Sequence, residues 1–301
     1  MTPLRTLLDR RESVILMGIL NRTPDSFSDG GRYLDDAAAL TRVDAMIAEG
    51  AAIIDIGAES TRPGARSVDD AEQLERLGDV VRAVAARGVL VSIDTTSPIV
   101  AERALRDGAK LVNSVSLEPA AELGKLAAAH GAALVLMHSR GAMTAMAGFS
   151  VYAEDAYADV VADVAREWSA AAERALRSGL SREALILDPG LGFFKNARQS
   201  IELCARLDEL VALGFPVLVG PSRKSFVARL ASAEHEPVAP PSRRLGGSVA
   251  AALACVERGA AIVRAHDVAE VKQALAVAAA IRGARVGQRA TGRPTGEVGC
   301  A

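Results

Sequence analysis

The sequence predicts a single-domain α/β protein, a (β/α)8 TIM barrel. Eight short apolar runs recur along the 301 residues, and each is followed by a polar or glycine-containing loop and an alanine-rich segment with helical spacing. The length suits one large α/β barrel, and no linker divides the chain. An open, doubly wound sheet is the alternative, because periodicity alone does not prove that a sheet closes.

The apolar runs are rich in Val and Ile, which is typical of strands buried on both faces of a parallel sheet. The predicted strands are residues 14–20, 51–57, 88–94, 110–115, 133–138, 184–189, 215–220 and 260–266.

The segments between the runs have the composition of helices, and several end in glycine, often after a basic residue, as helices commonly do. The predicted helical segments are residues 35–49, 69–87, 97–107, 119–129, 154–178, 198–212, 244–258 and 267–282.

The two ends of the chain differ from this pattern. Residues 1–13 form an N-terminal extension without the apolar stretch of a signal peptide, the barrel occupies 14–282, and the glycine-rich segment 283–301 is expected to be a disordered tail. No charge-free apolar run of about 18 residues occurs, so no membrane span is expected. These observations favour a cytoplasmic protein.

The composition excludes some partners. The net charge is −2 with acids and bases interspersed, which argues against a nucleic-acid or anionic-membrane surface. Cys204, Cys255 and Cys300 form no paired or metal-like pattern and are interpreted as reduced thiols.

Nearly every predicted strand ends in a polar residue, and the active site of such a barrel lies at the C-terminal ends of its strands. Any one of these residues could be a helix cap, but together they predict a ligand pocket. The set is Asn21, Asp55 with Glu59, Thr61 and Arg62, Asp94, Asn113, His138, Asp188, Lys224, and Arg264 with His266.

These residue types suit a heterocycle attached to an anion. Asp94 and Asp188 each end an apolar run, where a carboxylate needs hydrogen-bond donors such as the N–H groups of a ring. Asn113 can donate and accept at a ring edge, and Lys224 adds a cationic donor. Asp188 could instead cap its loop, and Lys224 could be solvated.

A phosphate-like anion is the second expected ligand. Arg62, Arg264 and His266, with Asn21, supply the donors for it, and a metal ion could accompany the anion. No "GxSxG" elbow accompanies the histidines, so a Ser–His–Asp hydrolase is not supported.

The ordered motifs "MGILNRTPDSFSDGG", "DIGAESTRPGA", "SIDT", "LVNS", "LMHSRG", "LILDPGLGFFKN", "GPSRKSF" and "RAHDV" resemble those of the dihydropteroate synthase family. The resemblance implies a TIM-barrel transferase of folate biosynthesis. It would condense 6-hydroxymethyl-7,8-dihydropterin diphosphate with 4-aminobenzoate to give 7,8-dihydropteroate and diphosphate. It also implies Mg²⁺, a homodimer and a sulfonamide target.

The resemblance assigns roles by position. It gives catalytic roles to Asp94, Lys224, Arg264 and Asn21, with Asn21 also at the Mg²⁺. The implied pterin contacts are Asp94, Asn113, Met137, Asp188 and Lys224. The implied diphosphate contacts are Asn21, Arg62, Arg264 and His266. The implied aminobenzoate contacts are Ser26, Phe27, Thr61, Arg62, Pro63, Phe193, Lys224 and Ser225.

The expected chemistry begins with departure of diphosphate, which leaves a cation on the pterin methylene that Asp94 would favour. The uncharged arylamine then attacks. Residues 23–31 are expected to act as a lid. The alternatives are a pterin-binding methyltransferase-like domain and a catalytically silent, pterin-binding paralogue.

Four residues depart from the family's usual pattern. Arg22 stands where the family commonly has a small aliphatic residue, and Ser114 stands where it commonly has an aspartate. Phe194 stands where a small residue is frequent, and Pro221 precedes "SRKSF". The sequence does not decide what these changes do, nor does it decide sulfonamide sensitivity.

Overall fold

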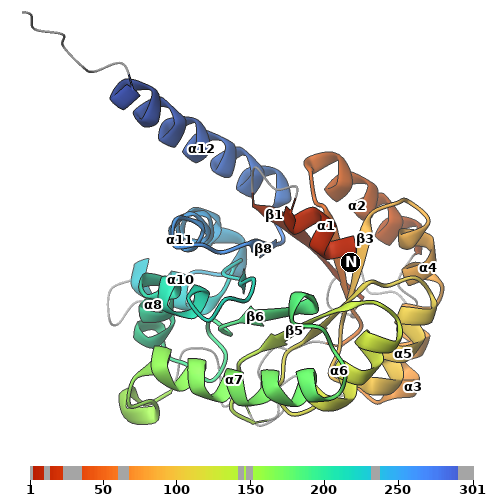
Figure 1. Cartoon of the computed structure of the whole chain (residues 1–301). Coiled ribbons are helices and arrows are strands. Elements are labelled where there is room, and N and C mark those ends of the chain that lie inside the picture. Colours follow the sequence, from red (N-terminus) through yellow and green to blue (C-terminus); the bar gives the residue numbers. More distant parts are fainter. Residues whose placement is uncertain are drawn as a thin grey trace, which may run out of the picture.

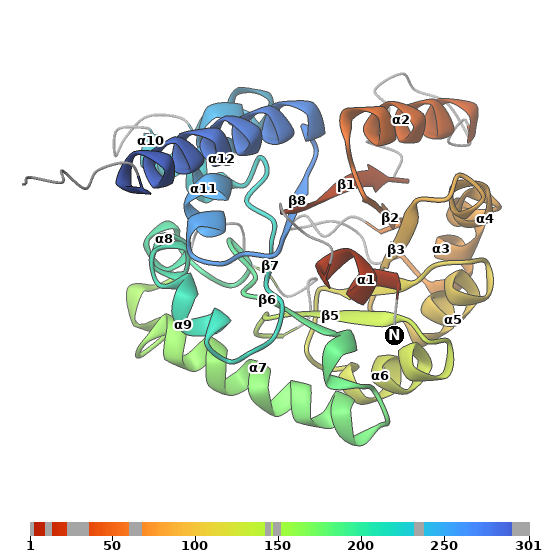
Figure 2. The same cartoon turned by 45° about the horizontal axis from the view of Figure 1, so that its top comes forward.

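Eight parallel strands form the centre of the molecule in a computed structural model, and helices surround them (Figures 1 and 2). The structure describes residues 3–9, 14–22, 36–59, 68–141, 146, 152–231 and 238–290, with the backbone alone for 285–290. The predicted fold class is confirmed. The strands are β1 Ile15–Asn21, β2 Ile53–Gly57, β3 Leu90–Asp94, β4 Leu111–Ser114, β5 Ala133–Met137, β6 Leu185–Asp188, β7 Leu218–Val219 and β8 Ile262–Ala265.

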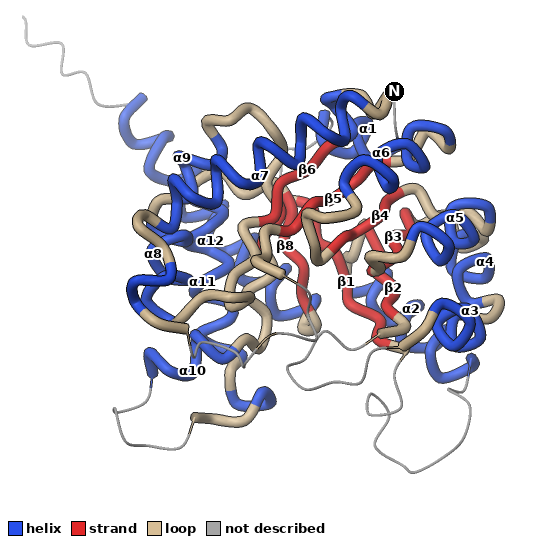
Figure 3. The backbone as a smooth tube through the Cα atoms, turned by 90° about the horizontal axis from the view of Figure 1, so that it is seen from below, coloured by secondary structure: helices blue, strands red, loops and turns tan. Residues whose placement is uncertain are grey.

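The strand order decides between a barrel and an open sheet. The order is β6-β5-β4-β3-β2-β1-β8-β7, which leaves β6 and β7 as the two ends. These ends meet through a parallel bridge between Leu187 and Val217, and the Leu187 N–H donates to the Pro216 carbonyl at 2.9 Å. The sheet therefore closes on itself. Figure 3 shows the strands from below, surrounded by the helices.

The helices follow the strands as predicted, with three differences. Segment 69–87 divides into two helices at Gly78, whose φ is 49°, and segment 198–212 divides at Arg206. An additional helix, α10, follows Lys224. The helices of the barrel wall are α2 Asp36–Glu49, α3 Asp70–Leu77, α4 Val80–Ala85, α5 Pro98–Arg106, α6 Ala120–Ala129, α7 Val160–Arg177, α8 Ala197–Ala205, α9 Leu207–Val211, α10 Ser225–Ala231 and α11 Leu245–Glu257.

Local sequence sets several helix starts. Ser97 accepts a hydrogen bond from the Val100 N–H, with Pro98 in the first turn of α5. Asn196 and Gln199 form a reciprocal capping box at the start of α8. That box fixes the direction in which the chain leaves the β6 loop for α8.

The terminal helices change the expected boundaries. Helix α1, Pro3–Asp9, lies within the predicted N-terminal extension; its Leu4 and Leu8 are buried in the barrel core. Helix α12, Val268–Ala290, continues past residue 282, where a disordered tail was expected to begin. Residues 283–290 contain Ala, Arg and Gln, which favour helix, so the two glycines do not end it. In Figure 1 this helix projects beyond the barrel.

The core fills the barrel and the space between strands and helices. All residues of β2, β4, β5, β6 and β7 are buried, in line with the continuous apolar runs of the sequence. No helix among the described residues is long and apolar enough to cross a membrane.

Candidate active site

Strand register places three of the predicted rim residues, Asn21, Asp94 and Asn113, in one row. Asn21 pairs with Gly57, Gly57 with Asp94, and Asp94 with Asn113, so the row crosses β1 to β4. Farther round the barrel, Met137 pairs with Asp188 across β5 and β6. Parallel strands thus bring these residues to the same C-terminal edge, as expected for the active-site end of a barrel.

Arg264 connects the carboxylates inside this edge. Its Nε donates to Asp55 Oδ2 at 2.6 Å, and its terminal nitrogen donates to Asp94 Oδ2 at 2.8 Å. Asn113 Nδ2 donates to the same Asp55 oxygen at 3.0 Å. The Asn113 amide therefore turns its donor towards Asp55 and keeps its carbonyl oxygen for another partner. Asp55, which the sequence placed on the rim without a role, is the centre of this network.

Burial dominates the electrostatics of the network. It raises the pKa of Asp94 to about 7, against the opposing charge of Arg264. Burial alone would lower the pKa of Arg264, but the carboxylates of Asp55 and Asp94 outweigh it and the pKa is raised. Arg264 therefore stays charged, whereas Asp94 changes its charge near neutral pH.

Asp188 lies at the end of β6 and begins a tight turn. Its Oδ1 accepts a hydrogen bond from the Gly190 N–H at 2.8 Å, so the loop-cap interpretation is correct for one of its oxygens. Burial raises the pKa of Asp188, and Lys224 and the Gly190 N–H oppose that shift. Glycine is required at position 190, because a Cβ there would lie 2.1 Å from the His138 carbonyl oxygen.

Lys224 precedes α10, and its Nζ lies 4.4 Å from the centre of the Phe193 ring, within cation–π range. Burial lowers its pKa to about 8, although Asp188 opposes the shift. Lys224 and Phe193, predicted to share the aminobenzoate site, are therefore neighbours. Ser225, predicted for the same site, is the first residue of α10.

Met137 belongs to a small apolar cluster that is separate from the barrel core. The cluster consists of Val115, Met137, Met146, Phe193 and Phe194, with Tyr152 packed against it. Its residues follow or end β4, β5 and β6 at the C-terminal edge. An apolar wall next to Asp188 suits the face of a flat ring.

His266 lies after β8, two residues beyond Arg264. Its ring Nδ1 is 3.0 Å from Ser222 Oγ, and its backbone N–H donates to the same oxygen at 3.1 Å. Ser222, in the loop after β7, therefore fixes both the backbone and the ring of His266.

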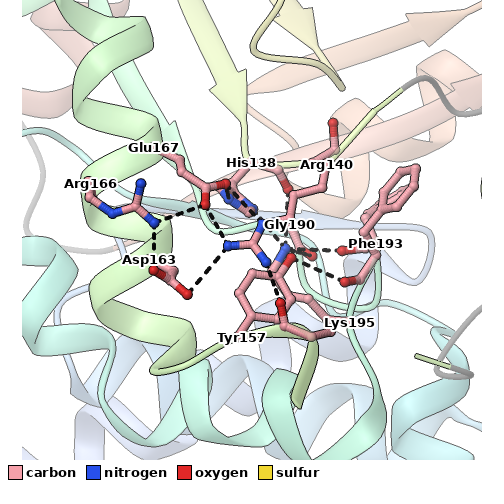
Figure 4. Close-up of polar contacts among 12 residues, drawn as sticks. His138, Arg140, Tyr157, Asp163, Arg166, Glu167, Gly190, Phe193 and Lys195 are labelled. Carbon is pink, nitrogen blue, oxygen red and sulfur yellow. Dashed lines mark hydrogen bonds and ion pairs between the residues drawn. The ribbon is translucent and has the colours of Figure 1, made fainter. Parts of the chain in front are cut away.

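His138 was predicted to line the pocket, and the structure places it elsewhere. Its side chain is fully buried and lies 2.9 Å from Glu167 of α7 and 3.0 Å from Lys195 (Figure 4). The strand was expected to end at residue 138 but ends at Met137, and the ring of His138 is engaged behind the β6 loop. Lys195 itself was missed. A lysine among the aromatic and glycine residues of "GLGFFKN" was the available signal.

Several predicted contacts lie outside the described residues. These are Ser26, Phe27, Thr61, Arg62 and Pro63. The predicted lid, residues 23–31, lies outside them as well.

Two of the unusual residues have clear partners. Arg22 is buried: its Nε donates to the Arg76 carbonyl at 2.8 Å, and another guanidinium nitrogen lies 2.7 Å from Asp36. Ser114 Oγ donates to the Ser116 carbonyl at 2.8 Å and so closes its own turn.

The residues present fit a magnesium ion held in part by substrate. No group of three or more His, Cys, Asp or Glu side chains in the described part of the chain could hold a metal by itself. Asn21 ends β1 in the row that leads to Asp94, and its amide oxygen is a hard ligand. Mg²⁺ commonly takes one or two protein oxygens together with phosphate oxygens and water, which matches such a site.

Comparisons with known proteins agree with this geometry. Residues 17–266 match the family described as "Pterin binding enzyme". The dihydropteroate synthase of Mycobacterium leprae is 45% identical over 271 residues, which is 89% of this chain and 93% of that protein.

Solved structures give the same result. A dihydropteroate synthase from Clostridium difficile, crystallised in the presence of pteroic acid, has a TM-score of 0.80 and 35% identity, covering 90% of this chain and 97% of that one. The Thermus thermophilus enzyme in complex with 4-aminobenzoate has a TM-score of 0.76 and 42% identity, covering 90% and 95%. The chain therefore belongs to the dihydropteroate synthase family of pterin-binding enzymes.

Proposed function

We propose that this chain catalyses the condensation of 6-hydroxymethyl-7,8-dihydropterin diphosphate with 4-aminobenzoate, yielding 7,8-dihydropteroate and diphosphate. The single observation that carries the proposal is the largely buried arrangement of Asp94, Asn113 and Arg264 at the C-terminal edge of the barrel. In this arrangement Asp94 and Asn113 offer acceptors for a heterocycle, and Arg264 supplies a permanent positive charge.

The pterin would be held between the two carboxylates. Asp94 and Asp188 accept hydrogen bonds from its N–H groups, and the free carbonyl oxygen of Asn113 accepts another. Lys224 donates to a ring acceptor from the opposite side, with its pKa of about 8 leaving the ammonium form dominant at neutral pH. Met137 packs against the face of the ring.

The reaction needs no covalent intermediate with the protein. The C–O bond to diphosphate breaks with both electrons on the leaving oxygen, and the positive charge on the pterin methylene is favoured by ionised Asp94. The arylamine nitrogen then forms the C–N bond and releases its proton. Arg264 and His266 would neutralise the departing diphosphate.

The proposal includes Mg²⁺, with Asn21 as its protein ligand beside the diphosphate. When bound, the ion would neutralise leaving-group charge. The residues of the chain would then orient the two substrates relative to each other.

The aminobenzoate would lie against Phe193 and Lys224, whose contact forms the described part of its site. The carboxylate of 4-aminobenzoate would meet the ammonium of Lys224 or the donors of Ser225. A sulfonamide that resembles 4-aminobenzoate would compete at the same position, so we propose that the chain is a sulfonamide target.

We further propose a homodimer that uses the apolar groove between α8, α10 and α11. The groove has a volume of about 410 Å³, and its lining includes Ile201, Phe226, Val227 and Leu230. Leu230 is 55% exposed and Ile201 37%, which is unusual for large apolar side chains that face water. Leu230→Glu should produce a monomer in sedimentation measurements.

A cytoplasmic location completes the proposal. It is supported by the cysteine usage of the chain, in which Cys204 and Cys255 are free and buried. The expected partners are the two small substrates and a second copy of the chain, with neither nucleic acid nor membrane.

A diphosphate-release assay with both substrates and Mg²⁺ tests the activity. Wild-type protein should release diphosphate and form 7,8-dihydropteroate when both substrates and Mg²⁺ are present, and Asp94→Asn should lower kcat/KM by a factor of about 100. Pterin binding without diphosphate release would instead indicate a silent paralogue. An unchanged rate in Asp94→Asn would contradict the role of that carboxylate.

A further inference from the structure

Lys195 is a buried lysine on the far side of the β6 loop from the substrates. Its side chain is fully buried, and its Nζ lies within hydrogen-bonding distance of four acceptors. The acceptors are the Phe193 carbonyl at 3.0 Å, His138 Nδ1 at 3.0 Å, the Gly190 carbonyl at 3.2 Å and the His138 carbonyl at 3.3 Å. An ammonium group has only three donors, so all of them are engaged.

The contacts of Lys195 hold both ends of one turn. The Phe193 N–H donates to the Gly190 carbonyl at 3.1 Å, which closes the turn, and Lys195 then binds the carbonyls of these same two residues. The turn contains two residues with positive φ, Gly190 at 67° and Gly192 at 79°, and Phe194, which directly follows it, has a φ of 50°. For Phe194 that conformation is strained, so surrounding contacts have to maintain it.

A second row of charged and polar side chains supports Lys195. Its bond to His138 Nδ1 requires that nitrogen to be an acceptor, so His138 Nε2 carries the proton and donates to Glu167. Arg140 binds Glu167, and its guanidinium lies 3.8 Å from the centre of the Tyr157 ring. Tyr157 in turn donates to the Phe194 carbonyl at 3.1 Å. Figure 4 shows these side chains converging on the turn from α7 and the β5 loop.

The turn links two parts of the substrate site. At its start, the Gly190 N–H holds Asp188, and at its end the Phe193 ring faces Lys224. We infer that Lys195, supported by His138 and Glu167, is a positioning residue that sets the geometry of the pterin carboxylate Asp188 relative to the aminobenzoate wall Phe193. This inference rests on the proposed function, in which those two residues contact different substrates.

The protonation of Lys195 makes this role testable by pH. Burial lowers its pKa to about 7, and Asp188 is the largest opposing influence. The neutral amine that forms as pH rises has two N–H donors for the four acceptors, so the turn loses a bond and pterin affinity falls. Below that pKa, Lys195 is an ammonium group and keeps all three of its N–H donors. The titratable or charged side chains around Lys195 are His138, Glu167, Arg140, Tyr157, Asp188 and Lys224.

The first experiment uses Lys195→Met, which keeps an unbranched side chain one atom shorter and removes the donors. We expect the Kd for 6-hydroxymethyl-7,8-dihydropterin diphosphate to rise at least tenfold and the KM for 4-aminobenzoate to rise as well. Val84→Ala is the control, because Val84 is fully buried on α4 and lies outside this network. It should lower Tm and leave both constants unchanged. A Kd for Lys195→Met within twofold of wild type would overturn the inference.

The second experiment remains informative if Lys195→Met does not fold. Glu167→Gln keeps an acceptor for His138 but removes the negative charge that favours protonated Lys195, so the alkaline fall in pterin affinity should begin at least half a pH unit lower. Glu173→Gln is the matched control on α7, because Glu173 is 69% exposed and pairs with Arg177. Identical pH profiles for wild type and Glu167→Gln would contradict the inference.

These outcomes stay separate from the proposed activity. Absence of diphosphate release in wild type would refute the activity, whereas the Kd measurements test Lys195 without turnover. Asp94 and Lys224 also titrate near neutrality, but they do so in wild type and variants alike. The test is therefore the shift between the pH profiles of wild type and Glu167→Gln.

Discussion

The Arg264 guanidinium lies 2.8 Å from the Asp94 carboxylate, so a cation assigned to the diphosphate is bonded to an anion assigned to the pterin. The two strands concerned, β3 and β8, are separated in the sheet by β2 and β1, and Asp55 of β2 binds the same guanidinium at 2.6 Å. The pterin and diphosphate subsites are therefore electrostatically connected through one arginine.

Asp94→Asn should change the pH dependence of stability. Burial raises the pKa of Asp94 from 3.8 to about 7, so between these values the folded protein binds more protons than the unfolded chain. Stability contributed by Asp94 is therefore complete below pH 4 and is lost as pH rises through 7. Relative to wild type, Asp94→Asn should gain on the order of 2 kcal/mol in free energy of unfolding between pH 5 and pH 8. Urea denaturation measures this, and parallel curves for the two proteins would contradict it.

Arg22→Ala should destabilise the protein by about 1–2 kcal/mol. Arg22 directly follows β1 and binds both Arg76 of α3 and Asp36 of α2. Its removal leaves the Arg76 carbonyl without that donor. Asp36 is 57% exposed, so Asp36→Ala should cost less than Arg22→Ala. Calorimetric unfolding of both variants is the measurement; equal losses would show that the Arg76 contact contributes nothing.

Gly190→Ala should abolish pterin binding and cost about 3 kcal/mol or more of stability. A Cβ at this position would be 2.1 Å from the His138 carbonyl oxygen, so the turn and β5 would have to separate. Gly131→Ala is the control: its φ is 60°, but no atom lies within 4 Å of the added Cβ, so it reports backbone strain alone. The prediction requires normal pterin affinity in the control, measured by fluorescence titration, and fails if both variants bind equally.

Phe194→Gly should destabilise the protein by about 2 kcal/mol. Relief of the positive φ of 50° favours glycine by about 1 kcal/mol, but the loss of a buried aromatic ring costs about 3 kcal/mol. The ring packs against Tyr152, with centroids 5.5 Å apart. Phe194→Leu, which retains both the strain and apolar volume, should lose less. A stabilised Phe194→Gly variant would show that the strain outweighs the packing.

The sequence was sufficient for a parallel α/β sheet and for the edge at which its polar residues gather. Continuous Val- and Ile-rich runs can only be buried on both faces, and alternation with helices makes the strands parallel, so Asp94, Asn113 and Asp188 had to reach the same rim. Closure of the sheet between Leu187 and Val217 depended on long-range pairing, which periodicity does not encode.

The tertiary structure decided which polar side chains face one another. His138 directly follows β5, one residue beyond the strand's end, and packing against α7 turns its ring to Glu167 and Lys195. Arg22 could have pointed to solvent or to phosphate, and instead meets Arg76, which is 54 residues away in the chain. Local sequence determines which residues end a strand, whereas side-chain direction depends on donors and acceptors that other elements supply. The sequence thus determined which residues lie at the active-site edge. Only the fold determined that Lys195, His138 and Glu167 would support the turn after β6.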